Sequence, residues 1–178
     1  MSDDMIDGFE RKHIVATHEA GHAVICYVLG YDFVLLTIEP NEALGSDGAF
    51  QRSPLKEARE NSTLTEAGKK HWILDKIKMT LSGGLAVYQL TNNIKALGMD
   101  PDLNSAWGLA RMLLKDEEKA TELNTALASQ VGDLIRNKRN WVAITALAKA
   151  LIKSKTLDYE KAVNIIEKAF NDFDLGKA

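Results

Sequence analysis

The stretch His18-Glu19-Ala20-Gly21-His22 has the pattern H-E-x-x-H, in which two histidines are separated by one turn of a helix. Successive residues of an α-helix are rotated by about 100°, so residues four apart project from the same face. Two imidazoles placed in this way can bind one zinc ion, and the intervening glutamate can reach a metal-bound water without being a ligand. The stretch therefore predicts a helical zinc site with His18 and His22 as ligands and Glu19 as general base.

The residues around the motif predict a helix that packs against a core, because apolar positions recur at spacings of three and four. The stripe consists of Ile14, Val15, His18, Gly21, His22, Ile25, Cys26 and Leu29. Gly30 predicts the end of the helix. Gly21 inside a helix costs about 1 kcal/mol relative to alanine, so we expect another backbone segment to approach closely there. The residues alone leave an alternative, in which both histidines are hydrogen-bonded core residues.

The composition is that of an ordinary globular protein. The 178 residues are 46% hydrophobic and 26% charged, with a net charge of −3, which fits a single domain over residues 1–178. No basic cluster stands out, so we expect no nucleic-acid partner. The N-terminus is acidic and polar, and the most apolar run, residues 23–38, is interrupted and too short to cross a membrane. We expect a soluble, cytoplasmic protein.

The rest of the chain predicts a small sheet followed by helices. Residues 33–38 and 49–52 favour two short strands, the second near an edge of the sheet. Helices are expected from about residue 66, after Asp100-Pro101, at 117–139, at 141–153 and at 159–170, with a frayed tail at 172–178. Gly83-Gly84 predicts tight packing or a kink. The expected fold class is mainly α (α+β), with a two- to three-stranded sheet and a C-terminal helical bundle.

A catalytic zinc site usually takes three protein ligands and keeps an open position, so a third ligand must come from elsewhere in the chain. Cys26 lies one turn beyond the motif, but a lone buried cysteine is more often a small core side chain; being the only cysteine, it also fits a reducing compartment. His13 points about 140° away from the motif, and His71 has no pattern around it. Asp100 and Asp102 open a helix, where acids complement the helix dipole, and spacing alone favours that role.

Several stretches, in order along the chain, resemble the peptidase domain of the FtsH family, the membrane-anchored AAA zinc proteases. These stretches are residues 18–24, 43–45 with 50–51, 82–86, 101–112, 140–151 and 156–160. The resemblance extends from about residue 11 to residue 167. It implies a zincin-like helical peptidase domain, with a catalytic part at about 11–115 and a C-terminal helical part at 116–170.

In that family the aspartate of an Asp-Leu pair is the third zinc ligand, which corresponds to Asp102 here; Asp100 is the alternative. The resemblance thus implies Zn²⁺ held by His18, His22 and Asp102, with Glu19 as the catalytic base. The implied activity is hydrolysis of peptide bonds in unfolded or small polypeptides. An extended peptide could pair with the strand at 49–52. The family forms hexameric rings, so a homo-oligomer is expected by resemblance.

The chain departs from the family pattern in three places. No G-x-x-x-x-G-K-[ST] phosphate loop occurs in the sequence, so a separate ATPase or unfoldase partner would have to supply folded substrates. Val87-Tyr88-Gln89 stands where the family has a glutamate pair, which puts a carboxylate that orients a ligand in doubt. The stretch at 113–123 is also shorter than its counterpart in the family.

Two alternatives follow: a zinc-binding inactive relative that serves as adaptor or regulator, and a metal-free helical interaction module. Tyr88 is the candidate for the electrophile opposite Glu19.

Overall fold

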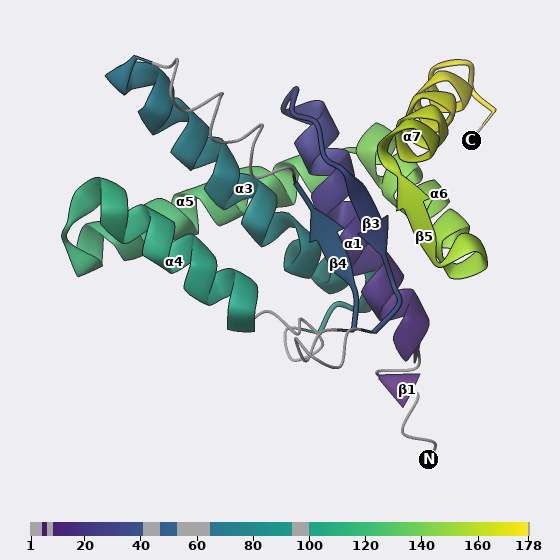
Figure 1. Cartoon of the computed structure of the whole chain (residues 1–178), viewed down its shortest axis with the longest axis horizontal. Helices are drawn as coiled ribbons and strands as arrows, with labels where there is room; N and C mark the ends of the chain where they lie inside the picture. The colour runs from purple at the N-terminus through teal and green to yellow at the C-terminus, as the bar shows by residue number, and fades with distance from the viewer. Residues whose placement is uncertain (1–4, 7–8, 41–46, 53–64, 94–99, 178) are drawn as a thin grey trace.

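The structure is a computed structural model that describes residues 5–6, 9–40, 47–52, 65–93 and 100–177. Within these residues, six helices and five short strands follow one another (Figure 1). The helices are α1 (Arg11–Val28), α3 (Glu66–Thr91), α4 (Asp100–Leu114), α5 (Glu117–Arg136), α6 (Lys138–Ser154) and α7 (Tyr159–Asp174). The strands are β1 (Met5–Ile6), β2 (Phe9–Glu10), β3 (Leu35–Thr37), β4 (Ala49–Gln51) and β5 (Thr156–Asp158). The mainly α fold with a small sheet is confirmed.

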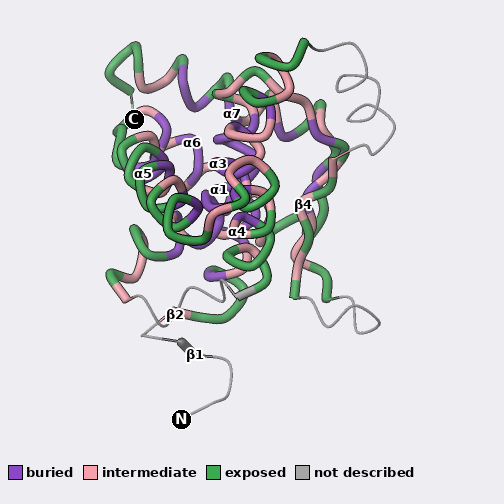
Figure 2. Tube along the Cα trace, turned by 90° about the vertical axis from the view of Figure 1, so that its left-hand side faces the viewer, coloured by how far each residue is buried: buried purple, intermediate pink, exposed green. Residues whose placement is uncertain are grey.

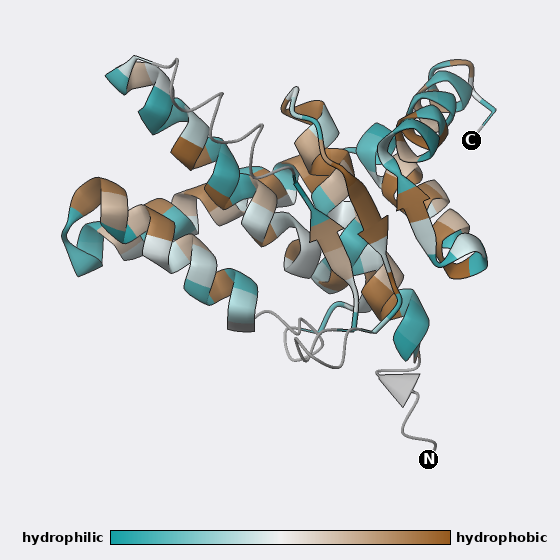
Figure 3. Ribbon diagram, viewed as in Figure 1, coloured by the Kyte–Doolittle hydropathy of each residue, from teal (hydrophilic) through white to brown (hydrophobic). Residues whose placement is uncertain are grey.

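Helix α1 lies at the centre of the molecule, and its residues from Glu19 to Cys26 are buried without interruption (Figure 2). It packs against α3 on one side and α6 on another. Hydrophobic segments of α1 and β3 face each other, as the hydropathy colouring shows (Figure 3). Because α1 packs against α3, α6 and β3, most of the H-E-x-x-H motif is buried beside the main hydrophobic core. None of the described helices combines the length and the apolar character needed to cross a bilayer.

The sheet that accompanies α1 has the antiparallel order β4-β3-β5. Leu36 at its centre is paired with Phe50 of β4 and with Leu157 of β5. The predicted position of β4 at an edge is confirmed. In the sequence, Thr156-Leu157-Asp158 has the pattern of a hydrophobic staple and N-cap for the last helix. Asp158 does cap α7 by accepting a hydrogen bond from the Lys161 N–H, and the same three residues also form β5. A strand of three residues is too short to show the alternation of apolar and polar side chains that identifies a strand in a sequence. The sequence therefore did not predict β5.

Three predicted helix boundaries are wrong. The helix expected at 117–139 ends at Arg136, because Asn137 adopts an extended backbone with ψ of 121°. The Asn137 side chain then accepts hydrogen bonds from the N–H groups of Arg139 and Asn140, so α6 starts at Lys138 instead of residue 141. At the other end, the tail expected to fray from 172 stays helical to Asp174. The polar composition of residues 53–65 predicts a loop, and residues 92–99 are expected to connect two helices. Both segments lie almost wholly outside the described residues.

A second hydrophobic cluster joins α3, α4 and α5. Its buried members are Ile77, Leu81, Ala106, Ala110, Ala120 and Leu127. The two alanines of α4 allow its backbone to approach α3 closely. This packing places the first turn of α4, which carries Asp102, against the middle of α1.

Candidate metal centre

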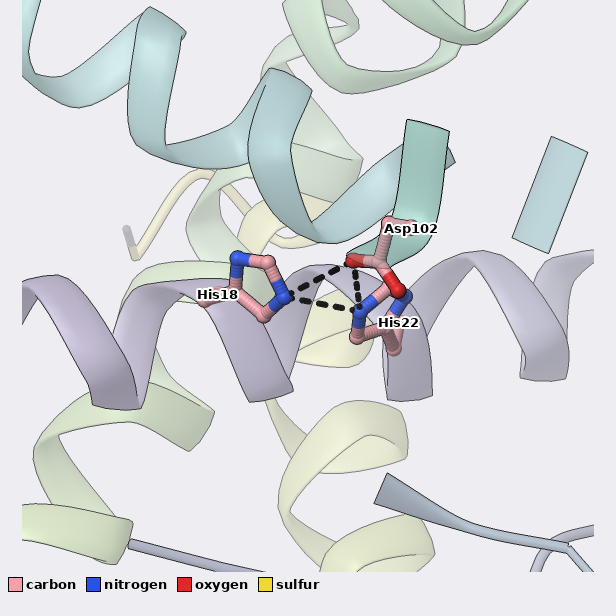
Figure 4. A group of neighbouring side chains, drawn as sticks. All are labelled: His18, His22 and Asp102. Carbon is pink, nitrogen blue, oxygen red and sulfur yellow. Dashed lines mark hydrogen bonds and ion pairs between the residues drawn. The ribbon is translucent and has the colours of Figure 1, made fainter. Parts of the chain in front are cut away.

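The structure brings together the three residues that the sequence analysis nominated as ligands (Figure 4). His18 and His22 project from one face of α1, and their Nε2 atoms are 3.0 Å apart. Asp102 reaches the same point from α4, with Oδ2 3.0 Å from His18 Nε2 and 3.2 Å from His22 Nε2. Within the described part of the chain, no other set of three potential ligand residues lies as close.

Two of the three converging atoms, His22 Nε2 and Asp102 Oδ2, carry lone pairs at the point of convergence. The ring of His22 lies with Nδ1 2.7 Å from the main-chain oxygen of Met79. Since a carbonyl can only accept, the proton of the neutral imidazole sits on Nδ1 and Nε2 is bare. Asp102 Oδ2 is buried and receives no proper hydrogen bond. Bare nitrogen and carboxylate oxygen repel each other at these distances unless a proton or a cation lies between them.

The charges of the cluster follow from this arrangement. Burial opposes ionisation of Asp102, but its contacts with His18 and His22 hold the pKa of this carboxyl well below its usual range. Burial acts to lower the pKa of His22. The neighbouring carboxylates of Asp102 and Glu19 outweigh burial, so the net pKa of His22 is raised. The cluster therefore retains a negatively charged oxygen among nitrogen donors, which is a suitable environment for a divalent cation.

Two glycines allow α1 and α3 to cross at this point. A Cβ on Gly21 would lie 2.7 Å from Ala86 Cβ and 2.8 Å from the Ser82 main-chain oxygen. The close approach predicted at Gly21 and the tight packing predicted at Gly83-Gly84 are thereby confirmed. A Cβ on Gly83 would lie 2.7 Å from His18 Nε2 and nearer still to His22 Nε2. Gly83 thus leaves open the space between the two imidazoles that any side chain would fill.

The residues present fit a zinc ion. A tetrahedral ion with bonds of about 2.0–2.1 Å separates its ligand atoms by about 3.3 Å, and the three observed separations are 3.0–3.2 Å. Two imidazole nitrogens and one carboxylate oxygen are a donor set that suits zinc. The space beside Gly83 and the unsatisfied Asp102 Oδ2 are both explained by an ion at this point.

The main-chain oxygen of Met79 and the hydroxyl of Ser82 lie beside the His22 ring and orient it. Ser82 is fully buried and donates a hydrogen bond of 2.6 Å to the same Met79 oxygen that holds His22 Nδ1. Val87, at the start of the divergent stretch, is buried in an apolar cluster with Ile14. Sequence reasoning missed this role of Met79, because every residue carries a carbonyl and no side-chain pattern marks the one that is used.

Glu19 is buried beside the histidines, and the chain leading into β4 lies against it. Burial raises the pKa of Glu19, with the histidines opposing and Asp102 reinforcing that shift. A Cβ on Gly48 would lie 3.0 Å from Glu19 Oε1. Phe50 of β4 stacks on the ring of His22, with centroids 5.7 Å apart and an angle of 24° between the rings. The edge strand β4 therefore borders both the base and the cluster.

The other sequence candidates lie elsewhere. His13 and His71 are exposed, as expected for residues outside the site. Cys26 is buried in the main core and points at the Tyr31 main-chain oxygen. Tyr88 is half exposed and lies five residues beyond Gly83, about 140° further around α3, so the structure does not place it at the site. Asp100 is the first residue of α4, and its side chain is outside the described part of the structure.

Comparison with known proteins gives a distant relationship. No model of a known protein family matches the chain. The ATP-dependent zinc metalloprotease FtsH of Hahella chejuensis (strain KCTC 2396) is 30% identical over 105 residues, which are 59% of this chain and 16% of that protein. The chain is thus similar to a part of an FtsH zinc metalloprotease, and the match spans about a sixth of that protein's length.

Proposed function

We propose that this chain is a zinc-dependent peptidase that hydrolyses peptide bonds in unfolded or small polypeptides. The observation that carries the proposal is the convergence of His18 Nε2, His22 Nε2 and Asp102 Oδ2 beside the buried carboxylate of Glu19. The distant similarity to a protein named as a zinc metalloprotease supports the same chemistry.

The roles of the residues follow from their positions. His18, His22 and Asp102 would hold the ion, which when bound supplies a Lewis acid that activates water and polarises the scissile carbonyl. Glu19 is next to a ligand on the same helix, so its carboxylate takes the proton of the attacking water and passes it to the leaving amine. The Met79 oxygen holds the His22 ring in the tautomer that presents Nε2.

Strand β4 would receive the substrate. In the described sheet it is an edge strand, and β3 pairs with its other side. Ala49 and Gln51 are exposed, whereas Phe50 is directed toward His22. An extended peptide can add to such an edge through main-chain hydrogen bonds. Main-chain hydrogen bonds of this kind contact few side chains of the substrate. We therefore expect the enzyme to accept many different substrate sequences.

Two assays test the proposal. Purified protein should contain close to one zinc per chain, and His22→Ala should abolish binding. The zinc-loaded wild type should cleave casein, and Glu19→Gln should abolish cleavage while zinc content is unchanged. Absence of zinc would contradict the metal site itself and favour a metal-free interaction module.

The second candidate is a zinc-binding relative without activity that serves as adaptor or regulator. The observation in its favour is that apolar Val87 is buried where the related family continues toward a glutamate pair. Stoichiometric zinc with no cleavage of any unfolded protein would favour this candidate. A separate ATPase partner and a hexameric assembly remain proposals by resemblance; a monomer in light scattering would contradict the assembly.

A further inference from the structure

The backbone just before β4 lies close to the carboxylate of Glu19, with no room for a side chain between them. A Cβ on Gly48 would lie 2.7 Å from Val15 Cγ1, 2.8 Å from the Thr37 main-chain oxygen and 3.0 Å from Glu19 Oε1. Real Cβ atoms essentially never come within 3.0 Å of another atom, so Val15 or Thr37 would have to shift, and the contact with Glu19 Oε1 would be tight. The backbone at Gly48 is therefore enclosed by α1, by β3 and by the carboxylate of Glu19 at the same time.

The residue before Gly48 is tied to the helix that carries Glu19. Arg11, the first residue of α1, forms an ion pair with Asp47, and its Nε is 3.0 Å from Asp47 Oδ2. Residues 11, 15 and 19 follow one another at intervals of one turn, so Arg11, Val15 and Glu19 lie along one side of α1. The Asp47–Gly48 segment runs against that side, next to both the start and the middle of the helix.

We propose that the Asp47–Gly48 segment is a positioning element that holds the Glu19 carboxylate in place between α1 and β4. This inference rests on the proposed function, in which Glu19 is the general base. The Arg11–Asp47 pair holds the segment against α1, and the missing side chain at Gly48 lets the backbone reach the carboxylate. Glu19 has several rotatable bonds, and contact on this side restricts the positions that its carboxylate can take.

Precise placement of the base explains why such an element is needed. A general base acts only within hydrogen-bond reach of the proton that it abstracts, and a misplacement of about 1 Å can cost about 100-fold in rate. The same segment continues directly into β4 through Ala49, which pairs with Thr37. The contact thus sets the base and the edge strand at a defined distance from each other.

The first test is Gly48→Ala in the zinc-loaded full-length chain. The methyl group should push the carboxylate aside, so kcat for casein cleavage should fall on the order of 100-fold, with KM and zinc affinity within about twofold of the wild type. The matched control is Gly108→Ala, since a Cβ on Gly108 meets nothing within 4 Å. An unchanged kcat, or a loss that appears only in KM, would overturn the inference.

The second test leaves Gly48 intact. Asp47→Asn removes the negative charge that pairs with Arg11. Because an exposed ion pair contributes little energy, we expect kcat to fall only about threefold. Asp174→Asn is the control, because Asp174 forms an equally exposed pair with Arg139 between α6 and α7. Equal kcat values for the two variants would contradict a role of the Asp47 pair in positioning.

A third measurement requires no turnover. Urea unfolding gives the decrease in the free energy of unfolding that Gly48→Ala causes. This decrease is measured once in the wild-type background and once in the Glu19→Ala background. The clashes with Val15 and Thr37 are present in both backgrounds. If the carboxylate also meets the added methyl, the decrease should be smaller in the Glu19→Ala background by the part that the carboxylate contributes. Equal decreases would overturn the inference whatever the activity. A zinc-loaded wild type that cleaves nothing would instead contradict the proposed function. The unfolding measurements would still show whether residue 48 and the Glu19 carboxylate interact.

Discussion

The two sides of the His18–His22–Asp102 cluster are built in different ways. His18 and His22 lie on the central helix within the main core, where the side chain of His22 is 8% exposed. Asp102 comes from the first turn of α4, is 26% exposed, and is held in place by the separate cluster of α3, α4 and α5. The helix alone therefore aligns two ligands, whereas the third depends on how a second cluster packs. The site is preorganised on one side and assembled by tertiary structure on the other.

Removing a ligand from each side should separate their contributions. His22→Ala and Asp102→Ala should both reduce zinc from near one per chain to near zero. Without metal, His22→Ala should lower the free energy of unfolding by about 2–3 kcal/mol, because it empties a buried site and leaves the Met79 oxygen with one donor fewer. Asp102→Ala should cost less than about 1 kcal/mol, since this side chain is partly exposed. Urea unfolding of the metal-free variants measures both; equal costs would contradict the contrast.

Filling the space at the helix crossing should weaken zinc binding without removing a ligand. In Gly83→Ala the methyl group would occupy the gap between the two imidazoles, so zinc affinity should fall at least about 100-fold. Competition with a chromophoric chelator measures the affinity. Gly108→Ala on α4 is the control and should bind zinc like the wild type. Wild-type affinity in Gly83→Ala would show that the ion does not lie beside α3.

Loosening the support of His22 should have a smaller effect. Ser82→Ala removes the hydroxyl that shares the Met79 oxygen with His22, and zinc affinity should fall about 10-fold. Thr80→Ala is a matched control, because Thr80 donates to the Lys76 oxygen on the same helix away from the site. If both variants lose affinity equally, the Ser82 hydroxyl acts on α3 as a whole and not on His22.

The two carboxylates should titrate in opposite directions in the metal-free protein. Burial raises the pKa of Glu19 above its ordinary 4.5, and the histidines lower the pKa of Asp102 below its ordinary 3.8. Glu19 therefore contributes stability at low pH that is lost as pH rises through its folded pKa, whereas Asp102 contributes stability at higher pH that is lost as pH falls. Carbon-13 NMR of the side-chain carboxyls measures both values. The same direction of shift for both residues would contradict the arrangement.

Local periodicity accounts for what could be predicted on the α1 side. The spacing of four places His18 and His22 on one face in any α-helix, and the apolar stripe indicated which face is buried. A glycine inside a helix was enough to predict the close approach at Gly21. These inferences needed only the geometry of a single helix.

The sequence by itself determined the central helix, the pair of imidazoles with the intervening carboxylate, and the mainly helical fold, because these depend on residues within a few turns of each other. The resemblance to the FtsH peptidase domain implied Asp102 as the third residue of the cluster. Only the tertiary structure decided how Asp102 meets the histidines, that the Met79 oxygen orients His22, and that Gly83 and Gly48 leave room beside the imidazoles and Glu19. Those contacts join segments far apart in the chain, and main-chain atoms make several of them. No side-chain pattern records such contacts, so packing of the helices alone establishes them.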